Sequence, residues 1–309
     1  PYRRQRQMCI RDRERILNIE TVHQCNCCLG CKTLHPLVSV IDLSKTNLEQ
    51  QIIKFDFYTI LMMEGEIDDV LYGRKYYDYS NASLVFLTPG ESIKINKSKA
   101  LPSKGWLLAF HPDLISQTSL GEHIKDYSFF FYNPEEALHL SQREKAKAVE
   151  CICNIEEELR HAIDCHSQIL ISRYIELLLD HCNRFYERQF ITRCEANKKI
   201  MKKTDVLLKD YILSGKLKYN TSPSLGYCAK ILQLSSHYFN DLLKFESGKN
   251  IDEYFESKRL EMAKSMLLDS NNTVSVVTEK LGYPNIRYFS RLFKRITGVA
   301  PNNYRLSQN

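Results

Sequence analysis

Two segments near the C-terminus carry the same pattern of apolar and polar positions. The stretch SHYFNDLLKFESG at 236–248 returns as IRYFSRLFKRITG at 286–298, with Tyr, Phe, Leu, Lys and Gly in register after 50 residues. In both copies the apolar positions recur with the period of an α-helix and leave the polar positions on the opposite face. A repeat of this size indicates one structural element that is used twice.

Each repeated segment is predicted to be a helix with one side buried and the other exposed. The positions predicted to face the core are Phe239, Leu242, Leu243 and Glu246 in the first copy and Phe289, Leu292, Phe293 and Ile296 in the second. The positions on the polar sides are His237, Asn240, Asp241 and Lys244 in the first copy and Arg287, Ser290, Arg291 and Lys294 in the second. Gly248 and Gly298 follow where a helix is expected to stop, because glycine adopts the left-handed conformation without a Cβ penalty.

A shorter helix precedes each copy. The predicted helices cover 225–232 and 274–281, and turns at 233–235 and 282–284 lead into the repeated segments. Ser235 and Asn285 stand where an N-terminal cap is expected, since their side chains can accept a hydrogen bond from an unpaired backbone amide. Helix, short turn and helix form the arrangement that places a second helix in the major groove of DNA.

An amphipathic stretch at 251–269 separates the two units and predicts a rigid connecting helix. Two rigidly coupled helices about one turn of duplex apart, roughly 34 Å, could occupy successive major grooves. A single pair of amphipathic helices would be a weak signal, because such pairs also occur as ordinary structural elements. Two copies in register, with matching turns and glycine stops, favour tandem helix-turn-helix units.

Residues from about 200 to 309 resemble the DNA-binding domain of AraC/XylS-type transcription regulators. The resemblance is carried by YCAKILQLS at 227–235, LGY at 281–283, YFSRLFK at 288–294 and GVAP at 298–301, with Phe239, Leu243, Lys244, Gly248, Arg259, Leu260, Ala263, Leu267, Leu268, Tyr304 and Arg305. It implies a DNA-binding domain over 204–309. Base edges are expected to be read by His237, Asn240, Asp241, Arg287, Ser290 and Arg291, and phosphates to be contacted by Lys244 and Lys294.

Two residues depart from the pattern of this family. Thr278 stands where the family's second unit usually has alanine, so its hydroxyl needs a hydrogen-bond partner inside the domain. Asp241 stands where a basic or amide residue is frequent. Because an acid repels phosphate, its contact with a base is expected to be acceptance of a hydrogen bond from a cytosine amino group.

Charge is distributed unevenly along the chain. Residues 196–309 hold 19 lysines and arginines against 10 acids, a net charge of +9, whereas residues 16–195 hold 18 against 25, a net charge of −7. A basic domain joined to an acidic one is typical of nucleic-acid binding at one end of a chain. A basic solvated face is common on protein surfaces, so the positive charge indicates DNA binding only in combination with the tandem helices.

Length and composition limit the class of protein. A chain of 309 residues can bury two cores. It contains no run of about eighteen apolar residues and no secretory h-region, so no membrane partner is expected. Its 11 cysteines are therefore expected to be reduced thiols in the cytoplasm.

The stretch PYRRQRQMCIRDR at 1–13 begins without an initiator methionine. Within it, MCIRD at 8–12 resembles a translated adaptor sequence from a sequencing library. We interpret residues 1–13 as a non-native tail and leave them out of the fold prediction. The alternative is a basic N-terminal arm that touches DNA.

Short β-like runs replace the helical pattern in the first third of the chain. They lie at 37–41, 51–61, 83–87, 92–95 and 105–110, and Gly73, Asn81, Pro89, Gly90, Pro102 and Ser103 mark turns between them. Strands of this length and spacing predict a small antiparallel barrel or sandwich. In the family that the C-terminal region resembles, a cupin-like sensor barrel usually occupies this place, and we expect it over 20–130.

A cupin enzyme is the alternative for this barrel. Such an enzyme would hold a metal with a His-x-His pair, a carboxylate and a third histidine, whereas His23, His35 and His111 each stand alone. A catalytic metal site needs at least three convergent ligands. No metal, cofactor or enzymatic activity is therefore predicted, and His35 and His111 are expected at the ends of strands.

Four cysteines stand close together in CNCCLGC at 25–31. Cys25, Cys27, Cys28 and Cys31 could clasp a soft metal or form a redox switch. Structural zinc usually takes two pairs of ligands from separated loops, and the sequence has no second pair nearby. Reduced cysteines without a metal are the favoured interpretation.

A helical pattern returns after the β-like region. Ser141 and Glu144 form a capping-box signature, followed by an apolar stripe that continues through Ile163. A second helix is predicted over 167–188. In the family named above such helices commonly mediate dimerisation, so we assign 135–190 to a dimerisation segment and the polar, basic stretch 191–203 to a linker.

The sequence therefore predicts an α+β chain with a small N-terminal β-barrel and a helical pair, followed by an all-α domain with two helix-turn-helix units. Its predicted function is that of a cytoplasmic, sequence-specific DNA-binding transcription regulator that reads two adjacent major grooves. Double-stranded DNA and a second copy of the chain are the expected partners. A small-molecule effector, whose binding residues are unknown, and contact with RNA polymerase stay open. The alternative is a cupin-type ligand-binding protein or metal-dependent enzyme with secondary DNA binding.

Overall fold

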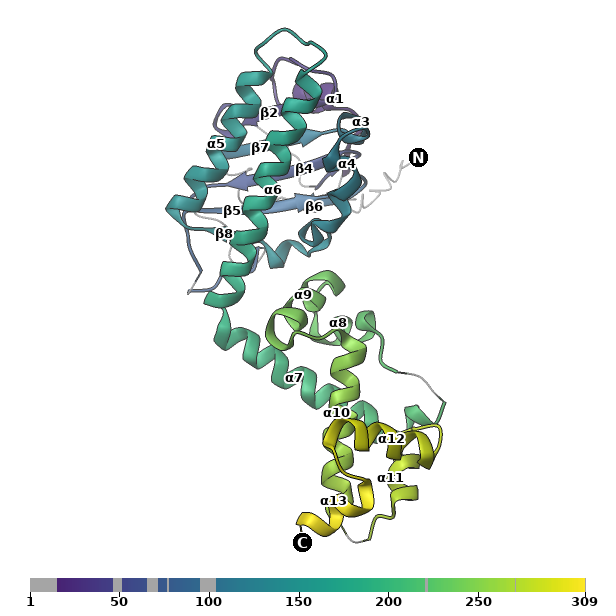
Figure 1. The fold of residues 1–309 in the computed structure, drawn as a ribbon. Coiled ribbons are helices and arrows are strands. Elements are labelled where there is room, and N and C mark those ends of the chain that lie inside the picture. Colours follow the sequence, from purple (N-terminus) through teal and green to yellow (C-terminus); the bar gives the residue numbers. More distant parts are fainter. Residues whose placement is uncertain are drawn as a thin grey trace, which may run out of the picture. The chain divides into compact units, whose positions relative to one another are not determined.

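The computed structural model describes residues 16–46, 52–65, 72–76, 78–94, 104–219, 222–269 and 271–308. The predicted tail at 1–13 and the predicted turn at 102–103 lie outside these ranges. The chain divides into an N-terminal unit, Pro1–Thr192, and a C-terminal unit, Arg193–Asn309. Among the described residues, the strands all belong to the N-terminal unit, so the chain is mixed α and β with an all-helical second part (Figure 1).

The described strands of the N-terminal unit form two sheets. β1 (Ile16–Ile19), β3 (Ile52–Phe55) and β6 (Ser92–Lys94) make a three-stranded sheet in the order β1-β3-β6, in which β1 runs parallel to β3. β2 (Val38–Asp42), β7 (Gly105–Phe110), β4 (Tyr58–Met63), β5 (Ala82–Leu87) and β8 (Leu138–Leu140) make an antiparallel five-stranded sheet in that order. At its centre Leu61 of β4 lies opposite Val85 of β5 and Leu107 of β7.

The predicted small barrel is not closed in the described residues, which form two sheets that share a core, as in the alternative of a sandwich. The run at 51–61, predicted as one strand, divides into β3 and β4 at Asp56 and Phe57. Asp56 N donates a hydrogen bond to Ile19 O at 3.0 Å, which holds this corner against β1 while β4 pairs within the other sheet. The exposed Asp56 marks the break, but a single charged residue within an apolar run is a weak signal for the end of a strand.

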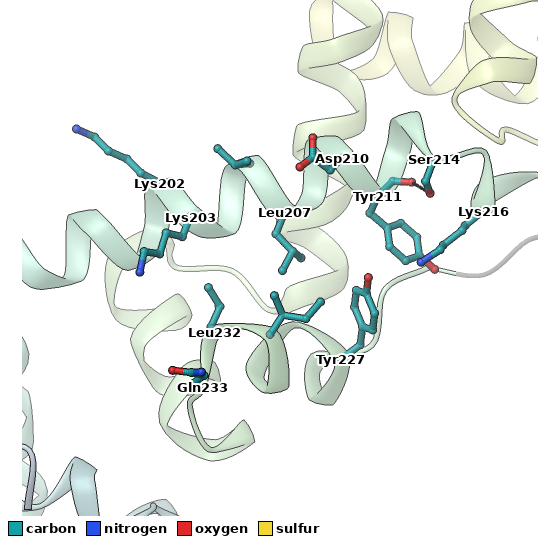
Figure 2. A pocket seen from close by; sticks show the side chains of 12 residues that line it. Lys202, Lys203, Leu207, Asp210, Tyr211, Ser214, Lys216, Tyr227, Leu232 and Gln233 are labelled. Carbon is teal, nitrogen blue, oxygen red and sulfur yellow. Dashed lines mark hydrogen bonds between the residues drawn. The ribbon is translucent and has the colours of Figure 1, made fainter.

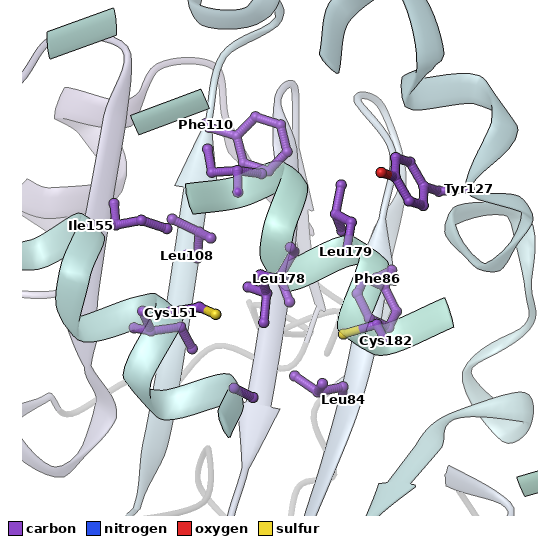
Figure 3. Packing of buried hydrophobic residues seen from close by; sticks show 14 of the residues in the cluster. Leu84, Phe86, Leu108, Phe110, Tyr127, Cys151, Ile155, Leu178, Leu179 and Cys182 are labelled. Carbon is purple, nitrogen blue, oxygen red and sulfur yellow. The ribbon is translucent and has the colours of Figure 1, made fainter. Parts of the chain in front are cut away.

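Apolar side chains fill both faces of the five-stranded sheet. Along β4, Ile60 points into one core and Leu61 into the other, because successive side chains of a strand alternate between the faces. The first core lies between the sheet and two long helices at 142–158 and 167–192. Figure 3 shows Leu108 of β7 in the same cluster as Ile155 and Leu178 of these helices. The second core lies between the two sheets and includes Val22.

Two long helices follow the strands, as the sequence predicts. The helices of the N-terminal unit are α1 (Val22–Cys28), α3 (Pro112–Ile115), α4 (Ser119–His123), α5 (Gln142–Glu158) and α6 (Ser167–Thr192). The predicted capping box of α5 is confirmed, since Glu144 N donates to Ser141 Oγ at 3.4 Å and Ser141 N donates to Glu144 Oε2 at 2.8 Å. The apolar stripe does not continue through Ile163, which lies beyond the end of α5 and is exposed.

The C-terminal unit is built from helices around one core. They are α7 (Cys194–Leu213), α8 (Leu225–Leu232), α9 (Ser236–Ser247), α10 (Ile251–Leu268), α11 (Val274–Lys280), α12 (Ile286–Thr297) and α13 (Pro301–Gln308). The segment 191–203, predicted as a linker, is helical on both sides of Arg193. Phe239 of α9, Ala263 of α10 and Phe289 of α12 belong to the same buried cluster, and Figure 1 shows α10 between the pair α8–α9 and the pair α11–α12.

Across the described ranges, no helix combines the length and the apolarity needed to cross a bilayer.

Candidate nucleic-acid interface

The first helix-turn-helix forms where the sequence predicts it. α8 ends at Gln233, whose left-handed φ of 59° reverses the chain, and Leu234 N donates to Ala229 O at 3.0 Å. Ser235 then caps α9, because its hydroxyl accepts a hydrogen bond from Tyr238 N at 3.1 Å. The predicted cap is confirmed, while the left-handed residue was missed. Aligning the first helices of the two units, which begin at Leu225 and Val274, would have found it, since Gln233 then stands opposite Gly282.

In the second helix-turn-helix the turn lies close against Leu217. Gly282 has a φ of +67°, and a Cβ at this position would lie 2.4 Å from Leu217 Cβ and 2.9 Å from Leu217 O. Glycine is therefore required both for the left-handed conformation and for the close approach of the neighbouring chain. Asn285 caps α12 as predicted, since its side-chain oxygen accepts a hydrogen bond from Tyr288 N at 2.8 Å.

Both repeated helices end at the predicted glycines. Gly248 has a φ of 67° and donates its N–H to Lys244 O at 2.8 Å, and Gly298 has a φ of 81° and donates to Lys294 O at 2.9 Å. Each glycine thus satisfies one carbonyl that the end of a helix leaves open.

The apolar faces are buried over most of their length. The buried positions are Phe239, Leu242, Leu243, Phe289, Leu292 and Phe293. Glu246 is half-buried, and Ile296 is 52% exposed, which corrects the prediction that it faces the core. Ile296 lies two turns beyond Phe289 on nearly the same line of the helix, so the face is right but the core ends before the last turn.

The opposite faces present the polar side chains that the sequence singles out. His237, Lys244, Arg287, Arg291 and Lys294 are exposed, whereas Asn240, Asp241 and Ser290 are half-buried. Within the described part of the chain, no hydrogen bond or ion pair holds the side chains of Arg287, Arg291 or Lys294. The cations of α12 are therefore available to an outside anion.

On α9 two of the candidate residues contact each other. Asn240 Nδ2 donates a hydrogen bond to Asp241 Oδ1 at 3.3 Å. An amide donor thus accompanies this carboxylate on the polar face of α9. The two helices consequently present different chemistry, mixed polar on α9 and cationic on α12.

A partly buried network fixes the turn of the second unit to α10. Arg259 donates from Nη2 to Leu281 O at 2.7 Å and from Nη1 to Glu256 Oε2 at 2.9 Å, and its guanidinium lies 4.0 Å from the centre of the Tyr283 ring. Tyr283 in turn donates its hydroxyl to Glu256 Oε1 at 2.8 Å. Burial, and after it the Glu256 carboxylate, raises the pKa of Tyr283 well above its usual range, so the phenol stays a donor. The family pattern includes Arg259, Leu281 and Tyr283, but no spacing in the sequence indicates that they touch, because Arg259 and Leu281 lie 22 residues apart.

The two departures from the family pattern have local explanations. Thr278 Oγ1 donates a hydrogen bond to Val274 O one turn earlier at 2.7 Å, which supplies the partner that its buried hydroxyl needs. Asp241 stands beside the amide of Asn240 rather than alone on the polar face.

The three histidines considered as metal ligands, His23, His35 and His111, each have a local contact. His35 lies before β2, where its Nδ1 accepts a hydrogen bond from Leu37 N at 3.1 Å, and burial lowers the pKa of this imidazole. His111 follows β7 and caps α3 by accepting from Asp113 N at 3.2 Å. His23 Nε2 lies 3.5 Å from Cys27 Sγ.

The cysteine cluster lies on and just after α1. Cys25 is buried in the core between the two sheets, and burial raises the pKa of its thiol to about 12. Cys27 and Cys28 are exposed, and Cys31 is half-buried. In the part of the chain that the structure describes, no group of three or more His, Cys, Asp or Glu side chains has the arrangement of a metal site.

Comparison with known proteins places the candidate interface in a known type of domain. A helix-turn-helix domain family matches residues 228–307, which include both repeated helices. The HTH-type transcriptional regulator YobQ of Bacillus subtilis is 39% identical over 77 residues, 25% of this chain and 32% of that protein. The raffinose operon transcriptional regulatory protein RafR of Pediococcus pentosaceus is 34% identical over 89 residues, 29% of this chain and 32% of that protein.

A third relative is the xylose operon regulatory protein of Haemophilus influenzae, 29% identical over 83 residues, 27% of this chain and 21% of that protein. The match therefore spans a third or less of the length of these curated relatives. Among solved structures, a DNA-binding transcriptional dual regulator of Escherichia coli K-12 is 17% identical over 36% of this chain and 94% of that chain, with a TM-score of 0.31. A score this low supports no statement about shared architecture.

Proposed function

Because the C-terminal unit is a helix-turn-helix domain of the AraC/XylS type, we propose that the chain is a sequence-specific transcription regulator that inserts α9 and α12 into two adjacent major grooves of DNA. One observation carries this proposal: the two helices expose their polar faces while their apolar faces enter one shared core. A shared core supports a fixed distance between the two helices, which reading two grooves at once requires.

The length of α10 agrees with this proposal. Its 18 residues correspond to an axis of about 27 Å. Successive major grooves on one side of a duplex are roughly 34 Å apart. A helix of this length that contacts both α9 and α11 can therefore act as the spacer between the two units.

The roles of individual side chains follow from their chemistry. Arg287 and Arg291, exposed on α12, suit bidentate contacts with guanine, and Ser290 between them suits a single hydrogen bond to a base. On α9, His237 and Asn240 would meet base edges, and Asp241 would accept from a cytosine amino group. Lys244 and Lys294, near the C-terminal ends of the two helices, would contact phosphates.

The N-terminal unit is proposed to hold the dimer interface on α6. This helix buries one side in the core and exposes Ile169, Leu170 and Leu177 on the other. An exposed apolar row on a long helix is typical of an interaction surface. We therefore keep 20–130 as a scaffold or sensor domain, 135–190 as the dimerisation segment, 191–203 as a helical connection and 204–309 as the DNA-binding domain.

Control by a small molecule and contact with RNA polymerase in the cytoplasm belong to the same proposal. Two of the relatives are named as regulators of sugar operons, which motivates sugars as the first effectors to test. A change in DNA affinity on addition of raffinose or xylose would support this part of the proposal, and unchanged affinity across a panel of sugars would argue against it.

Selection of bound sites from a random pool of duplex DNA tests the proposed function. The full chain is mixed with the pool at two salt concentrations, and the retained sequences are compared. We expect a site with two conserved segments about 10 base pairs apart, centre to centre. Recovery of sequences without any shared preference at moderate salt would contradict sequence-specific binding.

A further inference from the structure

A groove of about 860 Å³ runs along the C-terminal unit between α7 and α8. Its lining comes from α7, the turn that follows it, α8 and Gln233, whereas the proposed DNA contacts lie on α9 and α12. Figure 2 shows Leu207 of α7 and Leu232 of α8 pointing toward each other across the groove. The groove is therefore a surface that the proposed contacts with DNA do not use.

The floor of the groove is apolar and open to solvent. Val206 on α7 is 59% exposed and Ile231 on α8 is 52% exposed, and both line the groove together with Leu207 and Leu232. Apolar side chains exposed next to each other on neighbouring helices mark an interaction surface rather than an ordinary solvated face. Their position favours an occupant with apolar side chains of its own.

The ends of the groove are cationic. Lys202 and Lys203 lie toward one end and Lys216 toward the other (Figure 2), where its Nζ is 5.3 Å from the centre of the Tyr211 ring and 5.5 Å from that of Tyr227. In the described part of the chain, no hydrogen bond or ion pair holds the side chain of Lys202 or Lys203. Asp210 is the only carboxylate among the described lining residues, so the rim favours a negatively charged occupant.

The length of the groove matches that of a helix of about three turns. Its wall follows α7 from Lys202 to Ser214, an axis of about 18 Å or three helical turns. An amphipathic helix of the same length places an apolar residue on each turn along one face.

We propose that this groove binds an acidic amphipathic helix of a partner protein. The apolar row of that helix lies on Val206, Leu207 and Ile231, and its carboxylates meet Lys202 and Lys203 at one end and Lys216 at the other. The occupant also contacts Gln233, the residue that turns the chain from α8 into α9. Because no described residue that lines the groove lies on α9 or α12, the partner and DNA can bind at the same time.

The proposal is tested by selecting helical peptides of twelve randomised residues, displayed on phage, against the full chain. We expect enriched peptides to carry Asp and Glu around apolar residues spaced three or four apart. Individual peptides should bind Ile231→Ser about tenfold or more weakly than the wild type, because one apolar contact is lost. Ile296→Ser is the matched control, since Ile296 is also 52% exposed but lies outside the groove, and it should leave peptide binding unchanged.

The role of the lysines at the two ends of the groove is tested in the same peptide-binding assay. Lys203→Glu combined with Lys216→Glu should weaken the acidic peptides, and Lys249→Glu, an exposed lysine outside the groove, should not. Each variant is checked by circular dichroism and thermal unfolding, and Val206→Ser replaces Ile231→Ser if the latter fails to fold.

Three results overturn the proposal. The first is a selection that enriches no acidic amphipathic sequence. The second is an enriched peptide whose affinity is insensitive to the groove variants. The third is a lysine double variant that lowers DNA affinity and its salt dependence while peptide binding is unchanged, because the groove would then contact phosphates.

Discussion

Replacing Gly282 with alanine separates two demands that the second helix-turn-helix places on its turn. The first is the left-handed φ of +67°, which costs an alanine about 1 kcal/mol. The second is space, because the new Cβ would lie 2.4 Å from Leu217 Cβ and 2.9 Å from Leu217 O. Neither atom can move without its backbone, so this overlap should cost about 1–3 kcal/mol more.

Gly248→Ala is the matched control. Gly248 also has a φ of +67°, but among the described residues a Cβ there would meet no heavy atom within 4 Å. This variant should therefore lose only about 1 kcal/mol, whereas Gly282→Ala should lose about 2–4 kcal/mol in total.

Urea unfolding of the full chain measures the difference. Far-UV circular dichroism follows mainly the helices, and the fluorescence of Trp106, the single tryptophan, reports on β7 in the N-terminal unit. With an m-value of 1–3 kcal/mol/M, Gly282→Ala should lower the helical midpoint by about 1 M or more and leave the Trp106 transition in place. If Gly282→Ala and Gly248→Ala destabilise the chain equally, the close approach of Leu217 has no energetic weight and the reasoning fails.

Three further predictions concern the same domain. Arg291→Ala should cost roughly 1–3 kcal/mol of DNA-binding free energy and relax the preference at one base position, whereas Lys294→Ala should weaken binding to all sequences alike and reduce the slope of log affinity against log salt by about 0.9. Competition binding at several salt concentrations distinguishes the two variants, and an unchanged base preference in Arg291→Ala would refute the role of Arg291. Because the pKa of Tyr283 is raised in the folded chain, this phenol contributes fully to the free energy of unfolding below its ordinary pKa of 10.0, and the contribution is lost as the pH rises above that value. The difference in unfolding free energy between the wild type and Tyr283→Phe, measured by urea titration, should therefore shrink above pH 10. Gln233→Gly should stabilise the chain by about 0.5–1 kcal/mol in thermal unfolding, because it removes a side chain from a left-handed position, and a loss of stability would contradict the strain.

The helices of the C-terminal unit could be predicted closely because their signals are local. Ser235, Asn285, Gly248 and Gly298 act on the backbone within a few residues, and each was placed correctly from the repeat alone. Ile296 lies on the predicted face of α12 but is exposed, because the helical period of 3.6 residues predicts which face a residue lies on and not where along the helix the core ends.

The tertiary features could not be predicted for a physical reason. Arg259 meets Leu281 O and Tyr283 only after the chain folds, and no spacing in the sequence brings them together. In the N-terminal unit, β1 pairs in parallel with β3 across more than thirty residues, which a pattern of short apolar runs does not show. The same pattern therefore suggested a barrel where the described strands form two sheets.

The proposed reading of two adjacent grooves by α9 and α12 is tested most directly by inserting five base pairs between the two conserved segments of a selected site. Five base pairs rotate one segment by about half a turn of the duplex, and helices fixed by one core cannot follow it. The full chain should then bind the altered site no better than unrelated DNA. Unchanged affinity, measured by competition at moderate salt, would show that α9 and α12 do not read the two segments as one rigid unit.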